Sequence, residues 1–382
     1  MRNNGKFLVK FTEFGLTTPA MANNCKHSPI MVLCSTAIHD PAARRGLSWL
    51  QINNMTTIDN FTAGTQIDVV IPAAAKDVFK LPICIEQLIA NSLTPIRNIY
   101  VVTKPELFNL NSASADRVTW IDEATYPFSV KDVTERMKAR NNLHNNGSWY
   151  YQQLLKLYMF KAIPGLLPNA LILDSDFFIG QPMHFATSDG KALLAEGYSF
   201  KWLLNTRQYP SPPVHSHIDM ARRLVPGYDP VSPYSGMHHH MLFNVEIMSK
   251  LFSEIEGLHQ EEMWRAFIDC LDIDRWNGAC EYIIYYHFAM RFHGERVSAR
   301  HLKACDFIHD GKEGATAVLD MARSTLKAGS FQGVGCHGFL DLRTRLQTMD
   351  YIPADVREKM LAADNMAFKL MLDDGMLEIE AL

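Results

Sequence analysis

Short apolar runs, several of them rich in β-branched residues, alternate with segments of helical spacing over much of the chain. The runs cover residues 67–72, 99–103, 117–122, 171–173 and 192–195, and helical spacing fills residues 77–92 and 149–162. Strands that alternate with helices predict a largely parallel sheet that is covered by helices on both faces. We therefore predict an α/β fold with a mostly parallel sheet flanked by helices in a single large domain.

Two further segments flank this region. Residues 1–64 lack sustained periodicity and carry scattered Asn, Thr and Pro. This composition predicts an N-terminal appendage, which could be partly disordered. The α/β domain is expected to span residues 65–340. Residues 341–382 are polar, with Pro353 suited to a first helical turn, and predict a helical C-terminal tail.

Composition and charge exclude several classes of protein. The chain of 382 residues is 47% hydrophobic, enough for a sizeable core, and its net charge of −4 does not favour a polyanionic partner. Basic stretches are short and not interleaved with aromatic residues, so nucleic acid is not an expected partner. No segment approaches the ~20 apolar residues of a membrane span.

Cysteine usage favours a reducing compartment. The seven cysteines form no CxxC pair and leave an odd count, which fits reduced core thiols better than a disulfide framework or a zinc site. The first residues also lack the apolar segment of a secretory signal, because Lys10 interrupts the short run before it. We therefore expect a cytoplasmic protein.

Two carboxylates follow the strand at residues 171–173. Asp174 and Asp176 are separated only by Ser175, and a turn that begins there lets both side chains converge on one point. Hard oxygen donors at the carboxyl end of a buried strand suit Mg²⁺ or Mn²⁺, which take further ligands from substrate phosphates. Asp also favours turns and helix caps, so a purely structural turn is the alternative.

The helix predicted from residue 149 carries one polar stripe on an otherwise apolar surface. Gln152, Gln153 and Lys156 share a face at 100° per residue. Lys156 could reach a phosphate as a point charge, or it could extend from a buried helix to the surface. Glu281 opens another apolar helix, where a carboxylate either complements the helix dipole or acts as a base with a raised pKa.

Several histidines are candidate ligands. In an extended segment His238 and His240 share one face, and His239 points the opposite way. His309 and His337 are rival candidates for a ligand late in the sequence. No GxGxxG, P-loop, GxSxG or HExxH motif is found, so the standard dinucleotide, P-loop and simplest hydrolase interpretations lack their motifs.

Three blocks occur in a fixed order: Trp-Tyr-Tyr-Gln-Gln-Leu-Leu-Lys-Leu at residues 149–157, Leu-Asp-Ser-Asp at 173–176, and Glu-Tyr-x-x-Tyr at 281–285. With a first strand that ends in proline, this pattern resembles a GT-A glycosyltransferase of Rossmann-type fold. More narrowly, it resembles the uncharacterised, glycosyltransferase-like DUF6492-type family over roughly residues 66–310. Cys280 departs from that pattern, in which a serine precedes the glutamate.

The resemblance implies metal-dependent transfer of a sugar from a nucleotide-sugar donor to a carbohydrate or glycoconjugate acceptor, with open stereochemistry. It implies that Asp174 and Asp176 hold Mn²⁺ or Mg²⁺ against the donor diphosphate, with His309 or its rival His337 as a third ligand. Asp176 thereby takes part in catalysis, and Glu281 would serve the acceptor as a general base or hydroxyl-binding residue.

The resemblance also implies a nucleotide-binding border and an acceptor side. The residues expected to border the nucleotide and its phosphates are Asp68, Pro72, Ala73, Ala74, Lys156 and Asp174. The segment at residues 238–244 would line the acceptor side.

Three other functions remain open from the residues. A nucleotidyltransferase is expected to carry a glycine-rich basic loop after its first strand, and residues 72–77 contain no glycine. A non-catalytic carbohydrate-binding protein would use the aromatic loop at residues 200–237 and would need no metal. A metal hydrolase would be built on His215, His217 and the triplet at residues 238–240.

Overall fold

The computed structural model describes residues 66–108, 115–199, 216–274, 278–309, 315–338, 354–362, 367–373 and 376–381. The appendage predicted at residues 1–64 lies outside these ranges, as do residues 200–215 of the aromatic loop and residues 341–353 of the predicted tail. Among the described helices, none has the length and apolar character needed to cross a membrane.

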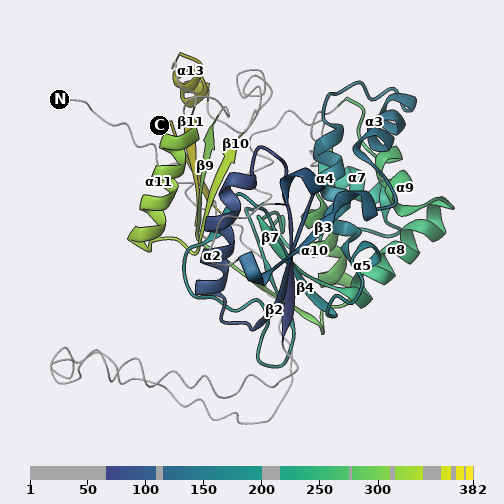
Figure 1. The fold of residues 1–382 in the computed structure, drawn as a ribbon. Helices are drawn as coiled ribbons and strands as arrows, with labels where there is room; N and C mark the ends of the chain where they lie inside the picture. Colours follow the sequence, from purple (N-terminus) through teal and green to yellow (C-terminus); the bar gives the residue numbers. More distant parts are fainter. Residues whose placement is uncertain are drawn as a thin grey trace, which may run out of the picture. The chain divides into compact units, whose positions relative to one another are not determined.

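The central sheet has five strands in the order β3-β2-β1-β4-β7 (Figure 1). The strands are β1 (Ile67–Pro72), β2 (Ile96–Thr103), β3 (Val118–Asp122), β4 (Asn169–Leu173) and β7 (His240–Asn244). β1 to β4 pair in parallel, and β7 pairs antiparallel to β4. All six residues of β1 are buried, as expected for a parallel strand covered on both faces. The predicted α/β fold with a mainly parallel sheet is therefore confirmed.

The helices connect and cover these strands. Their bounds are η1 (Val78–Lys80), α2 (Leu81–Asn91), η2 (Pro105–Leu107), η3 (Ala115–Arg117), η4 (Glu123–Thr125), α3 (Val130–Ala139), α4 (Gly147–Leu157), α5 (Met159–Ala162), α7 (Ser216–Leu224), α8 (Val245–His259), α9 (Met263–Asp269), α10 (Glu281–Phe292), α11 (Ala315–Ala328) and α13 (Ala354–Ala362). The single helix predicted over residues 149–162 is divided at Tyr158 into α4 and α5, and α4 begins after Asn146.

A second five-stranded sheet was not predicted. Its order is β12-β11-β9-β10-β5, formed by β5 (Phe177–Ile179), β9 (Ala304–His309), β10 (Gly333–Gly338), β11 (Ala367–Asp373) and β12 (Met376–Ala381). A small parallel pair, β6 (Ala192–Ala195) and β8 (Val297–Arg300), completes the described strands. Because β4 ends at Leu173 and β5 begins at Phe177, the three residues between them connect the two large sheets.

The predicted helical tail is wrong over its last part. After α13 the chain forms an antiparallel pair, β11 and β12, and β11 pairs antiparallel to β9. Asp373 lies opposite Met376, and the two residues between them are Asp-Gly, a sequence typical of a two-residue hairpin turn. β11 is a strand because it pairs with β9, and the polar composition of residues 341–382 does not by itself reveal this pairing.

We expect Gly236→Ala to destabilise the fold by about 3 kcal/mol, the combined cost of a left-handed residue with a side chain and of overpacking. Gly236 has a φ of +73°, and a Cβ there would lie 2.3 Å from the Cβ of Tyr286 in α10. Gly227 is a matched control, because its φ is +63° but nothing lies within 4 Å of an added Cβ. Urea unfolding of both variants measures the difference, and equal losses would contradict the packing argument.

Candidate functional site

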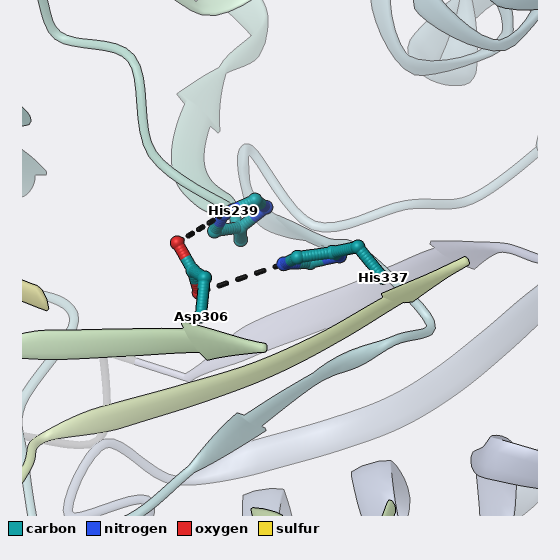
Figure 2. A group of neighbouring side chains, drawn as sticks. All are labelled: His239, Asp306 and His337. Atoms are coloured by element: carbon teal, nitrogen blue, oxygen red, sulfur yellow. Dashed lines mark hydrogen bonds and ion pairs between the residues drawn. The ribbon is translucent and has the colours of Figure 1, made fainter. Parts of the chain in front are cut away.

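Side chains from both sheets meet at the turn between β4 and β5. Asp174 and Asp176 lie on the turn, His239 directly precedes β7, Asp306 lies on β9 and His337 lies on β10. We call these five residues the acid–imidazole cluster. Figure 2 shows three of them, with the carboxylate of Asp306 beside both imidazoles.

The cluster is a continuous series of alternating carboxylates and imidazoles. His239 Nδ1 lies 3.2 Å from Asp174 Oδ2, and His239 Nε2 lies 3.1 Å from Asp306 Oδ2. His337 Nε2 lies 3.5 Å from Asp306 Oδ1, and His337 Nδ1 lies 2.9 Å from Asp176 Oδ2. The two imidazole rings stack with their centroids 4.3 Å apart. His239 is the most exposed member, with 28% of its side chain accessible, so the cluster is open to solvent there.

Glycine 335 provides the space in which two of these side chains approach. Gly335 pairs with Asp306 in the sheet, and His337 lies two residues further along the same face of β10. A Cβ on Gly335 would lie 2.2 Å from His337 Nε2 and 2.3 Å from Asp306 Oδ1. Only a residue without a side chain therefore permits this arrangement.

Alternation along the strand also selects one histidine of the triplet. His239 faces the cluster, whereas His238 and His240 are buried with their Nδ1 atoms 3.1 Å apart. Burial, together with the positive charge of His239, lowers the pKa of His238 to about 3. Hence His238 and His240 remain neutral, and the predicted division of the triplet between two faces matches the observed geometry.

The carboxylates of the cluster attract positive charge. Burial alone would lower the pKa of His239, but Asp306 and Asp174 outweigh it and raise that pKa to about 10. Burial also opposes protonation of His337, and Asp176 nevertheless raises its pKa. In turn, the pKa of Asp306 is lowered despite burial, chiefly by His239. A site of this kind stabilises cations.

Lys156 joins the cluster to the start of α10. Its Nζ lies 2.6 Å from both Asp174 Oδ1 and Glu281 Oε1, and 4.5 Å from the centre of the Tyr282 ring. Burial would lower the pKa of Lys156, but Asp174 and Glu281 raise it well above its ordinary value. Gln153 accepts a hydrogen bond from the backbone N–H of Glu281 at 3.2 Å. Gln153 and Lys156 of the polar stripe therefore contact the start of α10, and Lys156 does not extend to the surface.

Sequence reasoning missed His239 as a specific candidate, and it missed Asp306 and Lys80 altogether. Lys80 is buried, donates to Asp77 Oδ1 at 2.8 Å and to the carbonyl oxygen of Cys336 at 2.6 Å, and thereby connects η1 to β10. With Lys76, it lowers the pKa of Asp176 after the larger effect of His337. Two lysines within nine residues of the first strand were the available signal.

The residues expected to border the nucleotide divide into two groups. The β1–β4 register pairs Val70 with Ile172, so Pro72 at the end of β1 lies beside the Asp174 turn, followed by Ala73 and Ala74. Asp68 lies near the other end of β1, about 13 Å away at 3.3 Å per residue.

Asp68 is fully buried and has structural partners. Its Oδ1 accepts from Arg97 Nε at 3.0 Å, and its Oδ2 accepts from the backbone N–H of Leu167 at 2.8 Å. The structure therefore does not bring Asp68 to the site, and the prediction that it borders the nucleotide finds no support in this geometry. Its carboxylate instead anchors the start of β1 to the segment before β4.

The structure separates the two late histidines. His337 lies in the cluster, whereas His309 is three residues beyond Asp306 on β9 and faces the other side of the strand. His309 is buried and lies outside the cluster, so the geometry favours its rival His337 as the candidate third ligand. Glu281 lies close by but is only 3% exposed, and its carboxylate contacts Lys156.

A comparison with protein-family models matches residues 64–316 to DUF6492, a family of unknown function. The chain belongs to this family. The matched region contains Lys156, Asp174, Asp176 and Asp306, and it ends before β10 and His337.

No curated protein matches the chain. Among solved structures, the apo crystal structure of mouse xyloside xylosyltransferase 1 is similar at 12% identity and a TM-score of 0.34, covering 62% of this chain and 85% of that one. A likeness of this size establishes neither the same site nor the same reaction.

Replacing Lys156 by Met removes the cation between the buried carboxylate of Glu281 and the carboxylate of Asp174, which is 14% exposed. We expect the free energy of unfolding at neutral pH to fall by about 3–5 kcal/mol, because an unpaired buried charge has this cost. Lys161→Met is a matched control on α5, where the lysine side chain is 51% exposed, and it should cost less than about 0.5 kcal/mol. Equal losses in the two variants would contradict the assigned role of Lys156.

The stability of Lys156→Met should also depend on pH. Burial raises the pKa of Glu281 and Lys156 opposes this effect, so the pKa rises further when the lysine is removed. A carboxyl group with a raised folded pKa contributes stability below its unfolded pKa and loses that contribution as pH rises. The deficit relative to the parent protein should therefore be smaller at about pH 5 than at about pH 8 in urea unfolding. The same deficit at both values would exclude this explanation.

Proposed function

We propose that this protein is a divalent-metal-dependent glycosyltransferase that moves a sugar from a nucleotide sugar to a carbohydrate or glycoconjugate acceptor. The observation that carries the proposal is the meeting of the Asp174–Asp176 turn with His239, Asp306 and His337 at the carboxyl end of β4. In open α/β sheets, ligands bind outside the carboxyl ends of the strands. β1 also ends at this edge, with Pro72 beside the turn.

The donor set of the cluster suits a divalent cation. Asp306 Oδ1 and His337 Nε2 are shielded from solvent and make no hydrogen bond within the described part of the chain, although they lie 3.5 Å apart. Gly335 leaves the space around both atoms free of a side chain. When bound, a divalent ion supplies positive charge that stabilises a departing nucleoside diphosphate.

Residues of the chain contribute the remaining electrostatics. Lys76 is 45% exposed and lies close enough to lower the pKa of Asp176, so it is available for a phosphate at the edge of β1. Lys156 holds Asp174 in place, and Glu281 fixes Lys156. We therefore propose that Glu281 positions Lys156 rather than acting as the base, since its carboxylate is buried and already paired.

The proposed reaction breaks the bond between the anomeric carbon and the diphosphate oxygen. The acceptor hydroxyl oxygen forms the new glycosidic bond, and its proton passes to a base or to the departing diphosphate. Transfer to water instead of an acceptor would release the free sugar and the same nucleoside diphosphate.

Two of the rival functions receive less support from the geometry. A hydrolase on the histidine triplet would need its members to share one metal ion, but His238 and His240 contact each other at 3.1 Å while His239 contacts Asp174 and Asp306, and His215 lies outside the described residues. A non-catalytic carbohydrate-binding protein would not need the acid–imidazole cluster. A nucleotidyltransferase would use a nucleoside triphosphate, whereas the proposed glycosyltransferase uses a nucleotide sugar, so the nucleotide that binds distinguishes the two.

Thermal unfolding against a panel of nucleoside diphosphates, nucleotide sugars and nucleoside triphosphates tests the donor site. A ligand at 100 times its Kd should stabilise the folded protein by about 2.7 kcal/mol, and we expect this for one nucleotide sugar only when Mn²⁺ or a similar ion is present. At a limiting Mn²⁺ concentration the response should be strongly reduced in Asp176→Asn and persist in Asp320→Asn, which changes an exposed aspartate on α11.

Stabilisation by a triphosphate but by no nucleotide sugar would favour the nucleotidyltransferase. Stabilisation by a free sugar that persists in Asp176→Asn and with a chelator would favour the carbohydrate-binding protein. Either result would contradict the proposed donor site.

A further inference from the structure

We propose that the metal ion is held directly by His239, Asp306 and His337, and that Asp174 and Asp176 act on it through the two imidazoles. This inference rests on the divalent ion of the proposed function, but it does not depend on which reaction the protein performs. It assigns the Asp-x-Asp turn to the outer shell of the site, and it predicts a site made of two nitrogens and one carboxylate.

Both imidazoles have the same orientation. Each directs Nε2 toward Asp306 and Nδ1 toward a carboxylate of the turn, Asp174 for His239 and Asp176 for His337. Histidines that bind metals usually donate their other ring N–H to a carboxylate, which fixes the tautomer and the ring orientation. The observed arrangement provides this outer contact to both rings.

The three inner ligand atoms are spaced for one ion. One ligand atom from each of the three residues lies within 4.8 Å of the other two. His239 Nε2 lies 3.1 Å from Asp306 Oδ2, and His337 Nε2 lies 3.5 Å from Asp306 Oδ1. Two ligands of one ion, each about 2.1 Å from it, lie about 3.0–3.4 Å apart in octahedral or tetrahedral arrangements. Gly335 keeps this space free, because a Cβ there would reach both His337 Nε2 and Asp306 Oδ1.

Asp174 is already committed to other partners. Its Oδ1 lies 2.6 Å from Lys156 Nζ and accepts from the Tyr282 hydroxyl at 3.3 Å, while its Oδ2 contacts His239 Nδ1. Direct ligation by Asp174 would require one of these buried contacts to break. Ligation by the Nε2 atoms leaves all of them in place.

The ligand types select the ion. Imidazole nitrogens favour transition metal ions, whereas Mg²⁺ and Ca²⁺ prefer oxygen ligands alone. We therefore expect Mn²⁺, Fe²⁺, Co²⁺ or Zn²⁺ to bind at least tenfold more tightly than Mg²⁺.

Binding of Mn²⁺ to the full chain, followed by electron paramagnetic resonance, tests this assignment. Pulsed measurements detect nitrogen nuclei directly bonded to Mn²⁺, and the parent protein should show two imidazole nitrogens. His239→Gln should lose one of them and bind Mn²⁺ at least 100-fold more weakly. Asp174→Asn and Asp176→Asn should keep both nitrogens and weaken binding by about 10- to 100-fold, as outer-shell changes do.

His309→Gln is the matched control, because it changes a histidine on the same strand as Asp306 but outside the cluster, and both nitrogens should remain. Since 28% of the His239 side chain is exposed, His239→Gln is suited to retain the fold, which circular dichroism verifies. Full loss of binding in Asp176→Asn with unchanged binding in His239→Gln would overturn the inference and leave the transferase proposal standing. Tight Mn²⁺ binding with two nitrogens but no nucleotide response would support the ligand assignment and contradict the transferase proposal.

Discussion

Three carboxylates lie at the junction of the two large sheets, and the surrounding structure compensates their charge. Burying a carboxylate without a partner is costly, so each of the three is paired with a cationic or hydrogen-bonding group. Lys156 pairs with Asp174, His337 contacts Asp176, and His239 contacts both Asp174 and Asp306. These contacts bring α4, β7, β9 and β10 together around a three-residue turn.

Four strands of the central sheet, β1 to β4, could be predicted from the sequence because each contains a short run of aliphatic, β-branched or aromatic residues, whereas β7 was not among the predicted strands. The second sheet could not, for different reasons in different strands. β5 has only three residues, and β10 contains Gly333, Gly335 and Gly338, which are poor strand formers by propensity. Gly335 is required by the approach of His337 to Asp306, a contact between strands far apart in sequence that no local pattern reveals.

The candidate site was predictable from the sequence only in part. Asp174, Asp176, Lys156 and Glu281 stood out because polar groups in apolar segments are unusual, and the structure brings these four together. His239 was hidden within a triplet, and Asp306 lies in a strand of ordinary composition. The rivalry between His309 and His337 depended on which strand face meets the turn, which only the register of β9 and β10 determines.

The most direct test of the account is release of nucleoside diphosphate from a panel of nucleotide sugars in water, followed by liquid chromatography. The account predicts that one donor is consumed, that a chelator stops the release, and that an added transition metal ion restores it. Each turnover should yield one nucleoside diphosphate and one free sugar. A protein that binds the ion tightly but releases nucleoside diphosphate from none of the donors, with or without a carbohydrate acceptor panel, would contradict the proposed transferase.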